Sequence, residues 1–292
     1  MVMSKRSSNL PRRQLGRYLR ELRQQCGLSI VQAAKLAERS SGSLQRLETG
    51  ATDRIQPSDI EELCRIYDAP DYVEPLKGLA QQSNVKSWWH EYGDVIPASF
   101  NVYVGLESAA ERLTIYRPDM VSGLFQIPEY ARTLDHTYFP WESPTAIERR
   151  VNLRIRRQSL ITRKRKPATV RLVIDEAALR RMVGGPKVMA AQLRHLAGLP
   201  SNVTVQILPA AVGFPLGVSP GPFTILDFAV DEDGEPEEPT VVYVESYMGA
   251  MYFEMRDTVD QYRTAFGTLE RVALNPADSR NLLRRLAKEY SA

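Results

Sequence analysis

Two short helical patterns joined by a tight turn constrain the fold of this 292-residue chain more than any other feature. The first begins after Ser29, and Gln32 completes a capping box, in which each side chain accepts a hydrogen bond from the other residue's backbone N–H. The second begins after Ser40, a favourable N-cap residue, and stops at Gly50, which readily adopts the left-handed conformation that ends helices. We therefore expect two helices separated only by a turn of about Glu38 to Ser40.

These two helices are expected to cross closely. Their inner faces carry apolar residues at helical spacing, namely Ile30, Ala33, Ala34 and Ala37 in the first helix and Leu44 and Leu47 in the second. At the three alanines nothing larger than a methyl group separates the backbones. A close crossing with so short a turn is typical of the helix-turn-helix motif.

Three more helices are expected around this pair. One runs from Arg12 to Gln25 and is ended by Gly27, one runs from Ser58 to Tyr67, and the last runs roughly from Tyr72 to Gln82. The inward-facing residues are Leu15, Leu19, Leu22 and Cys26 in the first of these and Ile60, Leu63, Cys64 and Tyr67 in the second. We expect both cysteines to be small buried core residues, since two cysteines cannot build a disulfide-dense secreted scaffold.

The charge of the chain is uneven. Its net charge is only +3, but residues 1–56 contain eleven basic and four acidic residues, a local net charge of +7. Such a local excess of positive charge is the electrostatic footprint of a polyanion binder.

The segment SIVQAAKLAERSSGSLQRLETG resembles the XRE class of lambda-repressor-like regulators, and the resemblance covers about residues 12–82. It implies a five-helix DNA-binding domain, predicted at residues 12–83 after a flexible basic arm at residues 1–11. It also implies double-stranded DNA as the partner and a homodimer on a two-part site. Finally, it implies an ion pair between Arg23 and Glu48 that holds the first helix to the end of the recognition helix.

The resemblance assigns DNA contacts to individual residues. The second helix of the pair enters the major groove, so the residues implied to read bases are Ser41, Gly42, Gln45 and Arg46. Those implied to contact the DNA backbone are Ser29, Gln32, Ser40, Ser43 and Arg54. Arg46 is the best candidate for a specific contact, since its guanidinium can pair with both O6 and N7 of guanine, whereas Gln45 is equally compatible with a solvated helix face.

The rest of the chain, residues 84–292, is expected to form a larger α+β domain. Helices are predicted at Leu106–Tyr116, Pro128–Leu134, Pro144–Arg163, Pro186–Leu199, Thr258–Val272 and Asp278–Tyr290. Strands are predicted at Val170–Ile174, Val203–Leu208, Phe223–Phe228 and Val241–Glu245. In the long helix, Ile147, Val151, Ile155 and Leu160 are expected to face the core.

Residues 149–171 contain ten basic residues and no acidic ones. They could be a solvated helix face and turn, a second nucleic-acid contact, or a docking site for an acidic protein. The candidate residues for an acidic-partner patch are Arg149, Arg150, Arg154, Arg157, Arg163, Lys164, Arg165 and Lys166.

The third of these interpretations is favoured by a second resemblance. The stretches WWHEYGDVIP, YRPDMVSGLFQIPEYAR and NVTVQILP resemble the C-terminal domain of WhiJ-like actinomycete regulators, over about residues 88–290. The resemblance implies a small acidic partner protein and an antitoxin-like role. A small-molecule-gated regulator is the other alternative, with a pocket near Trp88, Trp89, Tyr116 and Phe125.

We do not expect an enzyme. Gly217–Gly221 matches the G-x-S-x-G nucleophile elbow, but Pro220 lacks the backbone N–H that would hold an oxyanion, and a strand rather than a helix is predicted to follow. The histidines and cysteines show no metal-ligand spacing and no glycine-rich phosphate loop occurs, so neither a metal nor a cofactor is expected. No apolar run is long enough to span a bilayer, and we expect a cytoplasmic protein.

Overall fold

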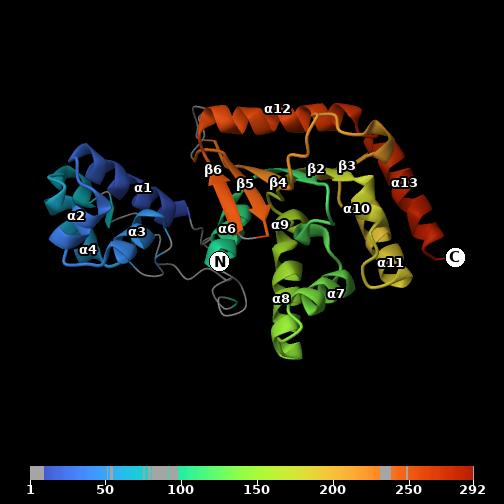
Figure 1. Cartoon of the computed structure of the whole chain (residues 1–292), viewed down its shortest axis with the longest axis horizontal. Coiled ribbons are helices and arrows are strands. Elements are labelled where there is room, and N and C mark those ends of the chain that lie inside the picture. The colour runs from blue at the N-terminus through green and yellow to red at the C-terminus, as the bar shows by residue number, and fades with distance from the viewer. Residues whose placement is uncertain are drawn as a thin grey trace. The chain divides into compact units, whose positions relative to one another are not determined.

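The computed structural model describes residues 10–50, 52, 55–74, 76–77, 80, 92, 98–230, 238–247 and 249–291 (Figure 1). The chain divides into two compact units, Met1–Gly93 with Phe100–Ala109 and Asp94–Ser99 with Ala110–Ala292. The predicted arm at residues 1–11 and the predicted boundary near residue 83 fall mostly or wholly outside the described residues.

The first unit contains the predicted helix-turn-helix. The elements between residues 10 and 72 are α1 (Leu10–Gln25), α2 (Ile30–Leu36), α3 (Ser41–Glu48), α4 (Pro57–Ile66) and the 3-10 turn η1 (Pro70–Tyr72). The first four predicted helices are therefore confirmed to within about two residues. Of the fifth, predicted from Tyr72 to Gln82, Tyr72 belongs to the turn η1, residues 73–74, 76–77 and 80 are helical, and the remainder lies outside the described residues.

The core of this unit is the one expected from the helical stripes. Leu15, Leu19, Leu44 and Leu63 are all buried in a single apolar cluster. Cys64 is also buried there, and burial raises the pKa of its thiol.

The prediction that Cys26 is buried was wrong, because Cys26 is exposed. Helix α1 ends at Gln25 and the chain turns at Gly27, which has a φ of 68°. Cys26 therefore lies one residue beyond the helix, and the stripe that buries Leu15, Leu19 and Leu22 does not extend to it.

The second unit is built on a mixed sheet. Within the described residues it has six strands in the order β3-β2-β1-β4-β5-β6. Their bounds are β1 (Arg112–Arg117), β2 (Thr169–Asp175), β3 (Val203–Leu208), β4 (Phe223–Asp227), β5 (Val241–Ser246) and β6 (Gly249–Phe253). The first three strands are parallel to one another, and the direction changes at β1, which pairs with β4 in antiparallel fashion.

Helices connect the parallel strands. The segments between β1 and β2 are α7 (Pro128–Tyr138), α8 (Pro144–Arg157) and α9 (Ser159–Thr162), and those between β2 and β3 are α10 (Glu176–Arg180) and α11 (Pro186–Ala197). The chain also contains α6 (Ala98–Ala109), α12 (Arg256–Val272) and α13 (Pro276–Glu289), with 3-10 turns η3 (Gly123–Phe125) and η4 (Ala210–Val212). The α+β class and all four predicted strands are confirmed.

Two helix predictions were wrong in part. Helix α6 ends at Ala109, and Arg112–Arg117 forms the central strand β1 instead of continuing the helix. Because β1 lies between two other strands, its residues from Leu113 to Tyr116 are all buried, and a strand buried on both faces shows no alternation that would reveal it.

The predicted helix Pro144–Arg163 is interrupted at Gln158, which separates α8 from α9. The side-chain amide of Gln158 donates to the carbonyl oxygen of Gln126 at 2.8 Å. Ile155 was expected to face the core but is 36% exposed. Strand β6 and the short helix α10 were not predicted.

The edge strand β3 is covered by the connection from α12 to α13. The backbone N–H of Leu274 donates to the carbonyl oxygen of Ile207 at 2.9 Å. The N–H of Ile207 donates to the hydroxyl oxygen of Ser279 at 3.0 Å, and Ser279 is fully buried. These contacts satisfy backbone groups that an open sheet edge would leave unpaired.

We predict that Ser279→Ala weakens this edge. The buried N–H of Ile207 would lose its acceptor, which costs about 1–3 kcal/mol. Hydrogen–deuterium exchange of residues 203–208 should become faster, while the exposed control Ser201→Ala should leave it unchanged. Unchanged exchange in Ser279→Ala would contradict the role given to this hydroxyl.

Candidate DNA-binding surface

Helix α2 begins with the predicted capping box. Ser29 is in extended conformation, and its hydroxyl accepts a hydrogen bond from the N–H of Gln32 at 3.3 Å. The side-chain oxygen of Gln32 accepts from the N–H of Ser29 at 2.9 Å. Both side chains are thus engaged within the helix, and their contacts with the DNA backbone stay a prediction.

Helix α3 is capped in the same way. The hydroxyl oxygen of Ser40 accepts from the N–H of Ser43 at 3.1 Å. The turn before it includes Glu38 at a φ of 50°, and the N–H of Arg39 donates to the carbonyl oxygen of Ala34 at 2.8 Å. These hydrogen bonds define where α2 ends and where α3 begins.

A buried ion pair joins α1 to the end of α3. The Nε of Arg23 donates to Oε1 of Glu48 at 2.6 Å, and its Nη2 donates to Oε2 at 2.9 Å. The remaining nitrogen, Nη1, donates to the carbonyl oxygen of Leu28 at 2.8 Å. The hydrogen bond with Glu48 raises the pKa of Arg23 above its ordinary value, so the guanidinium stays charged. The pair implied by the XRE resemblance is confirmed.

Gly16 makes the close approach of these helices possible. A Cβ atom at this position would lie 2.5 Å from the carbonyl oxygen of Glu48 and 2.7 Å from that of Leu47. No side chain fits there, because the contact is with backbone that cannot move aside. Gly16 was not predicted to have this role, although an isolated glycine inside a helical pattern is itself a signal of close packing.

The four predicted base-reading residues lie on the outward face of α3. Ser41, Gly42, Gln45 and Arg46 are all exposed, while Leu44 and Leu47 are buried on the opposite face. A Cβ atom at Gly42 would lie 3.8 Å from Nη1 of Arg46, so the guanidinium lies over the glycine one turn earlier. This is an ordinary van der Waals distance, so the close packing of Arg46 over position 42 does not itself require a glycine.

The structure describes four of the five residues that are predicted to contact the DNA backbone. Ser40 and Ser43 lie at the amino end of α3, and Ser29 and Gln32 lie at that of α2. Arg54 lies outside the described residues. Arg39, another cation of this unit, forms an ion pair with Asp59 in the first turn of α4 at 2.5 Å, which reduces its contribution to the positive field.

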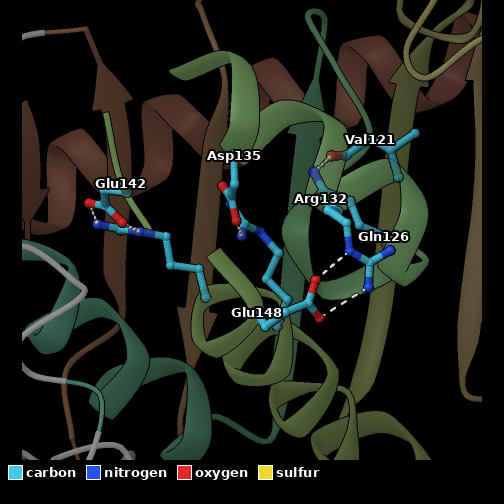
Figure 2. A network of polar contacts seen from close by, with 8 residues as sticks. Val121, Gln126, Arg132, Asp135, Glu142 and Glu148 are labelled. Carbon is cyan, nitrogen blue, oxygen red and sulfur yellow. Dashed lines mark hydrogen bonds and ion pairs between the residues drawn. The ribbon is translucent and has the colours of Figure 1, made fainter. Parts of the chain in front are cut away.

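In the second unit, three arginines of the predicted acidic-partner patch are not available to a partner. Figure 2 shows the polar network that occupies two of them. Arg150 pairs with both carboxylate oxygens of Glu142, at 3.0 and 2.5 Å, and Arg154 pairs with both oxygens of the buried Asp135. Arg157 is only 6% exposed. This part of the patch prediction needs correction, since these side chains stabilise the domain itself.

The other members of the patch reach the surface. Lys164, Arg165 and Lys166 are exposed, and Arg149 and Arg163 are half-buried. The partners of Arg150 and Arg154 come from α7 and from the loop between α7 and α8, so a count of charges along the sequence could not separate the two groups.

The predicted ligand pocket is only partly described. Phe125 is fully buried, and Tyr116 is buried against Phe223, with ring centroids 5.7 Å apart. Burial raises the pKa of Tyr116 to about 12, so its hydroxyl is neutral. Both side chains therefore belong to the core, and Trp88 and Trp89 lie outside the described residues.

Comparison with known proteins identifies both parts of the chain. Residues 14–75 match a family model described as a helix-turn-helix domain. Residues 100–285, more than half of the chain, match a family model described as a domain of unknown function (DUF5753). No curated protein and no solved structure matches the chain significantly. In the described part of the chain, no helix combines the length and the apolar character that crossing a membrane requires.

We predict that Gly16→Ala destabilises the first unit by about 1–3 kcal/mol, because the added methyl group would overlap the backbone of α3. Hydrogen–deuterium exchange of α1 and α3 should become faster. The matched control is Gly267→Ala, in the middle of α12, where a Cβ atom would meet nothing within 4 Å. There the same substitution should slow exchange, since alanine favours a helix by about 1 kcal/mol over glycine. Equal effects of the two substitutions would refute the close approach at Gly16.

Proposed function

Since the chain belongs to the DUF5753 family and carries an amino-terminal helix-turn-helix domain, we propose that it is a sequence-specific DNA-binding transcription regulator of the XRE type. The observation that carries the proposal is the outward face of α3. Its four exposed residues lie on a helix whose caps and ion pair hold it rigidly. A rigid helix with a polar, basic outer face is the element that reads the major groove in helix-turn-helix proteins.

In this proposal each group has a definite task. Arg46 pairs with O6 and N7 of a guanine, and Gln45 contacts a neighbouring base edge. The amino ends of α2 and α3, with Ser29, Gln32, Ser40, Ser43 and Arg54, contact phosphates and fix the register of the protein on the duplex. Two copies bind half-sites about one helical turn apart, as a cytoplasmic homodimer without a cofactor.

Selection of binding sites from random duplexes tests the proposal. Arg46→Ala should weaken binding to the preferred site by ~1–3 kcal/mol and relax the choice of base at one position of each half-site. The matched control is Arg65→Ala, which removes an exposed arginine from α4 and should leave the selected motif unchanged. Arg54→Ala should weaken all sequences alike and lower the dependence on salt.

Two results would count against the role of Arg46. One is the same enriched motif for the wild type and Arg46→Ala. The other is an equal loss of base preference in Arg46→Ala and Arg65→Ala.

A second candidate function is that of an antitoxin-type interaction protein, which mainly binds a small acidic partner and regulates its own synthesis. The exposed cations at the end of α9 and the resemblance to WhiJ-like regulators support it. The same random-duplex selection separates the two functions. A motif enriched by the purified chain alone favours the autonomous regulator, whereas enrichment that requires a second protein favours the interaction protein.

We further propose that the second unit acts by binding and not by catalysis. Ser219 of the G-x-S-x-G match is followed by Pro220, which offers no N–H, and then by strand β4. A nucleophile elbow requires an N–H at that position and a helix after it. Small-molecule gating is supported by no described contact.

A further inference from the structure

The end of α7 and the loop that joins it to α8 carry an unusually exposed group of aromatic side chains. Trp141 is 77% exposed and Tyr138 is 56% exposed. Phe139 lies between them, with its ring centroid 4.6 Å from that of Tyr138 and 6.2 Å from that of Trp141, both in edge-to-face orientation. We call Tyr138, Phe139 and Trp141 the aromatic tip. Large aromatic side chains exposed together mark a surface that binds another molecule.

Arg150 packs against the aromatic tip. The guanidinium of Arg150 lies 3.8 Å from the centre of the Phe139 ring, and the same guanidinium forms the two hydrogen bonds with Glu142. Arg132 of α7 pairs with Glu148 of α8 at 2.5 and 3.1 Å, which joins the two helices that flank the loop (Figure 2). An interface group that is already ordered loses little conformational entropy on binding.

A solvent-facing stripe follows the tip along α8 and α9. Thr145, Glu148, Asn152, Ile155 and Ser159 follow one another at helical spacing, which gives one face that leads to the loop at residues 163–166. Glu148 is half-buried and pairs with Arg132, and the other four residues are exposed. Helix α8 has 14 residues, so the face is about 20 Å long before it reaches α9. This length suits one side of a protein–protein interface of ordinary size.

The exposed cations lie at the end of the stripe that is farther from the aromatic tip. No acidic residue occurs between Arg149 and Ile174. The carboxylates of Glu142, Asp135 and Glu148 are paired with arginines, whereas Lys164, Arg165 and Lys166 are exposed beyond α9. The partner that complements this end of the surface is therefore acidic.

We propose that the aromatic tip and the α8–α9 stripe together form a docking surface for an acidic protein that has an apolar pocket for Trp141. The inference rests on the proposed binding role of the second unit and gives that role a location. A DNA duplex complements the cations, but its phosphate surface has no pocket for Trp141 and no apolar contact for the exposed Ile155. A protein offers both.

A displayed library of random peptides, selected on the full-length wild-type chain, tests the proposal. The enriched peptides should combine Asp or Glu with aromatic or aliphatic residues. Trp141→Ala should weaken their binding by about tenfold or more, as for an anchor residue of an interface. The double variant Lys164→Glu/Arg165→Glu should weaken it as well, and more strongly at low salt than at high salt.

Matched controls distinguish binding at this surface from non-specific peptide binding elsewhere on the protein. Phe214→Ala removes another aromatic side chain of the same unit, which is 75% exposed, and Arg280→Glu/Arg284→Glu reverses two exposed cations of α13. Neither control should change peptide binding.

Three outcomes would overturn the docking surface. Peptides without acidic residues, peptides that bind Trp141→Ala as well as the wild type, or no enrichment at all would each do so. Loss of non-specific duplex binding in the Lys164→Glu/Arg165→Glu variant, without loss of peptide binding, would assign the surface to nucleic acid instead. None of these results depends on Arg46, so failure of this inference is distinguishable from failure of the proposed DNA recognition.

Discussion

The buried ion pair between Arg23 and Glu48 is the interaction on which the DNA-binding geometry depends. The side chain of Arg23 is 9% exposed and that of Glu48 is 3% exposed, so either charge would be desolvated and unpaired without the other. Breaking such a pair costs about 3–5 kcal/mol. Because Arg23 also binds the carbonyl oxygen of Leu28, one guanidinium connects α1, the segment that enters α2, and the end of α3. The same two helices are in close backbone contact at Gly16.

The second unit uses the same chemistry for a different purpose. Arginine–carboxylate pairs join α7 to α8. Another such pair joins α8 to the loop that carries the aromatic tip. The arginines in these pairs are held in place by two hydrogen bonds each, a geometry that lysine cannot reproduce. The fold thereby divides one basic segment of sequence into structural arginines and solvent-facing cations.

Local features of the sequence predicted local features of the structure. The capping box at Ser29 and Gln32, the cap at Ser40 and the apolar stripes of α1 to α4 all depend on residues three or four positions apart, and a single sequence displays such spacing directly. Strand β1 was missed because its neighbours come from distant segments, which bury both of its faces and remove the alternating pattern. The pairing of Arg154 with Asp135 spans 19 residues and depends on how α7 packs against α8, so charge counting could not foresee it.

The proposed sequence specificity depends on recognition of a guanine by Arg46 in the major groove. Methylation interference with dimethyl sulfate tests it most directly, because the reagent modifies guanine N7, the atom that Arg46 is proposed to contact. For the wild type, methylation of one guanine in each half-site should block binding. For Arg46→Ala, methylation of that guanine should no longer matter, while any other interfering guanines should stay as they are. An identical interference pattern for the two proteins would show that Arg46 does not contact that guanine.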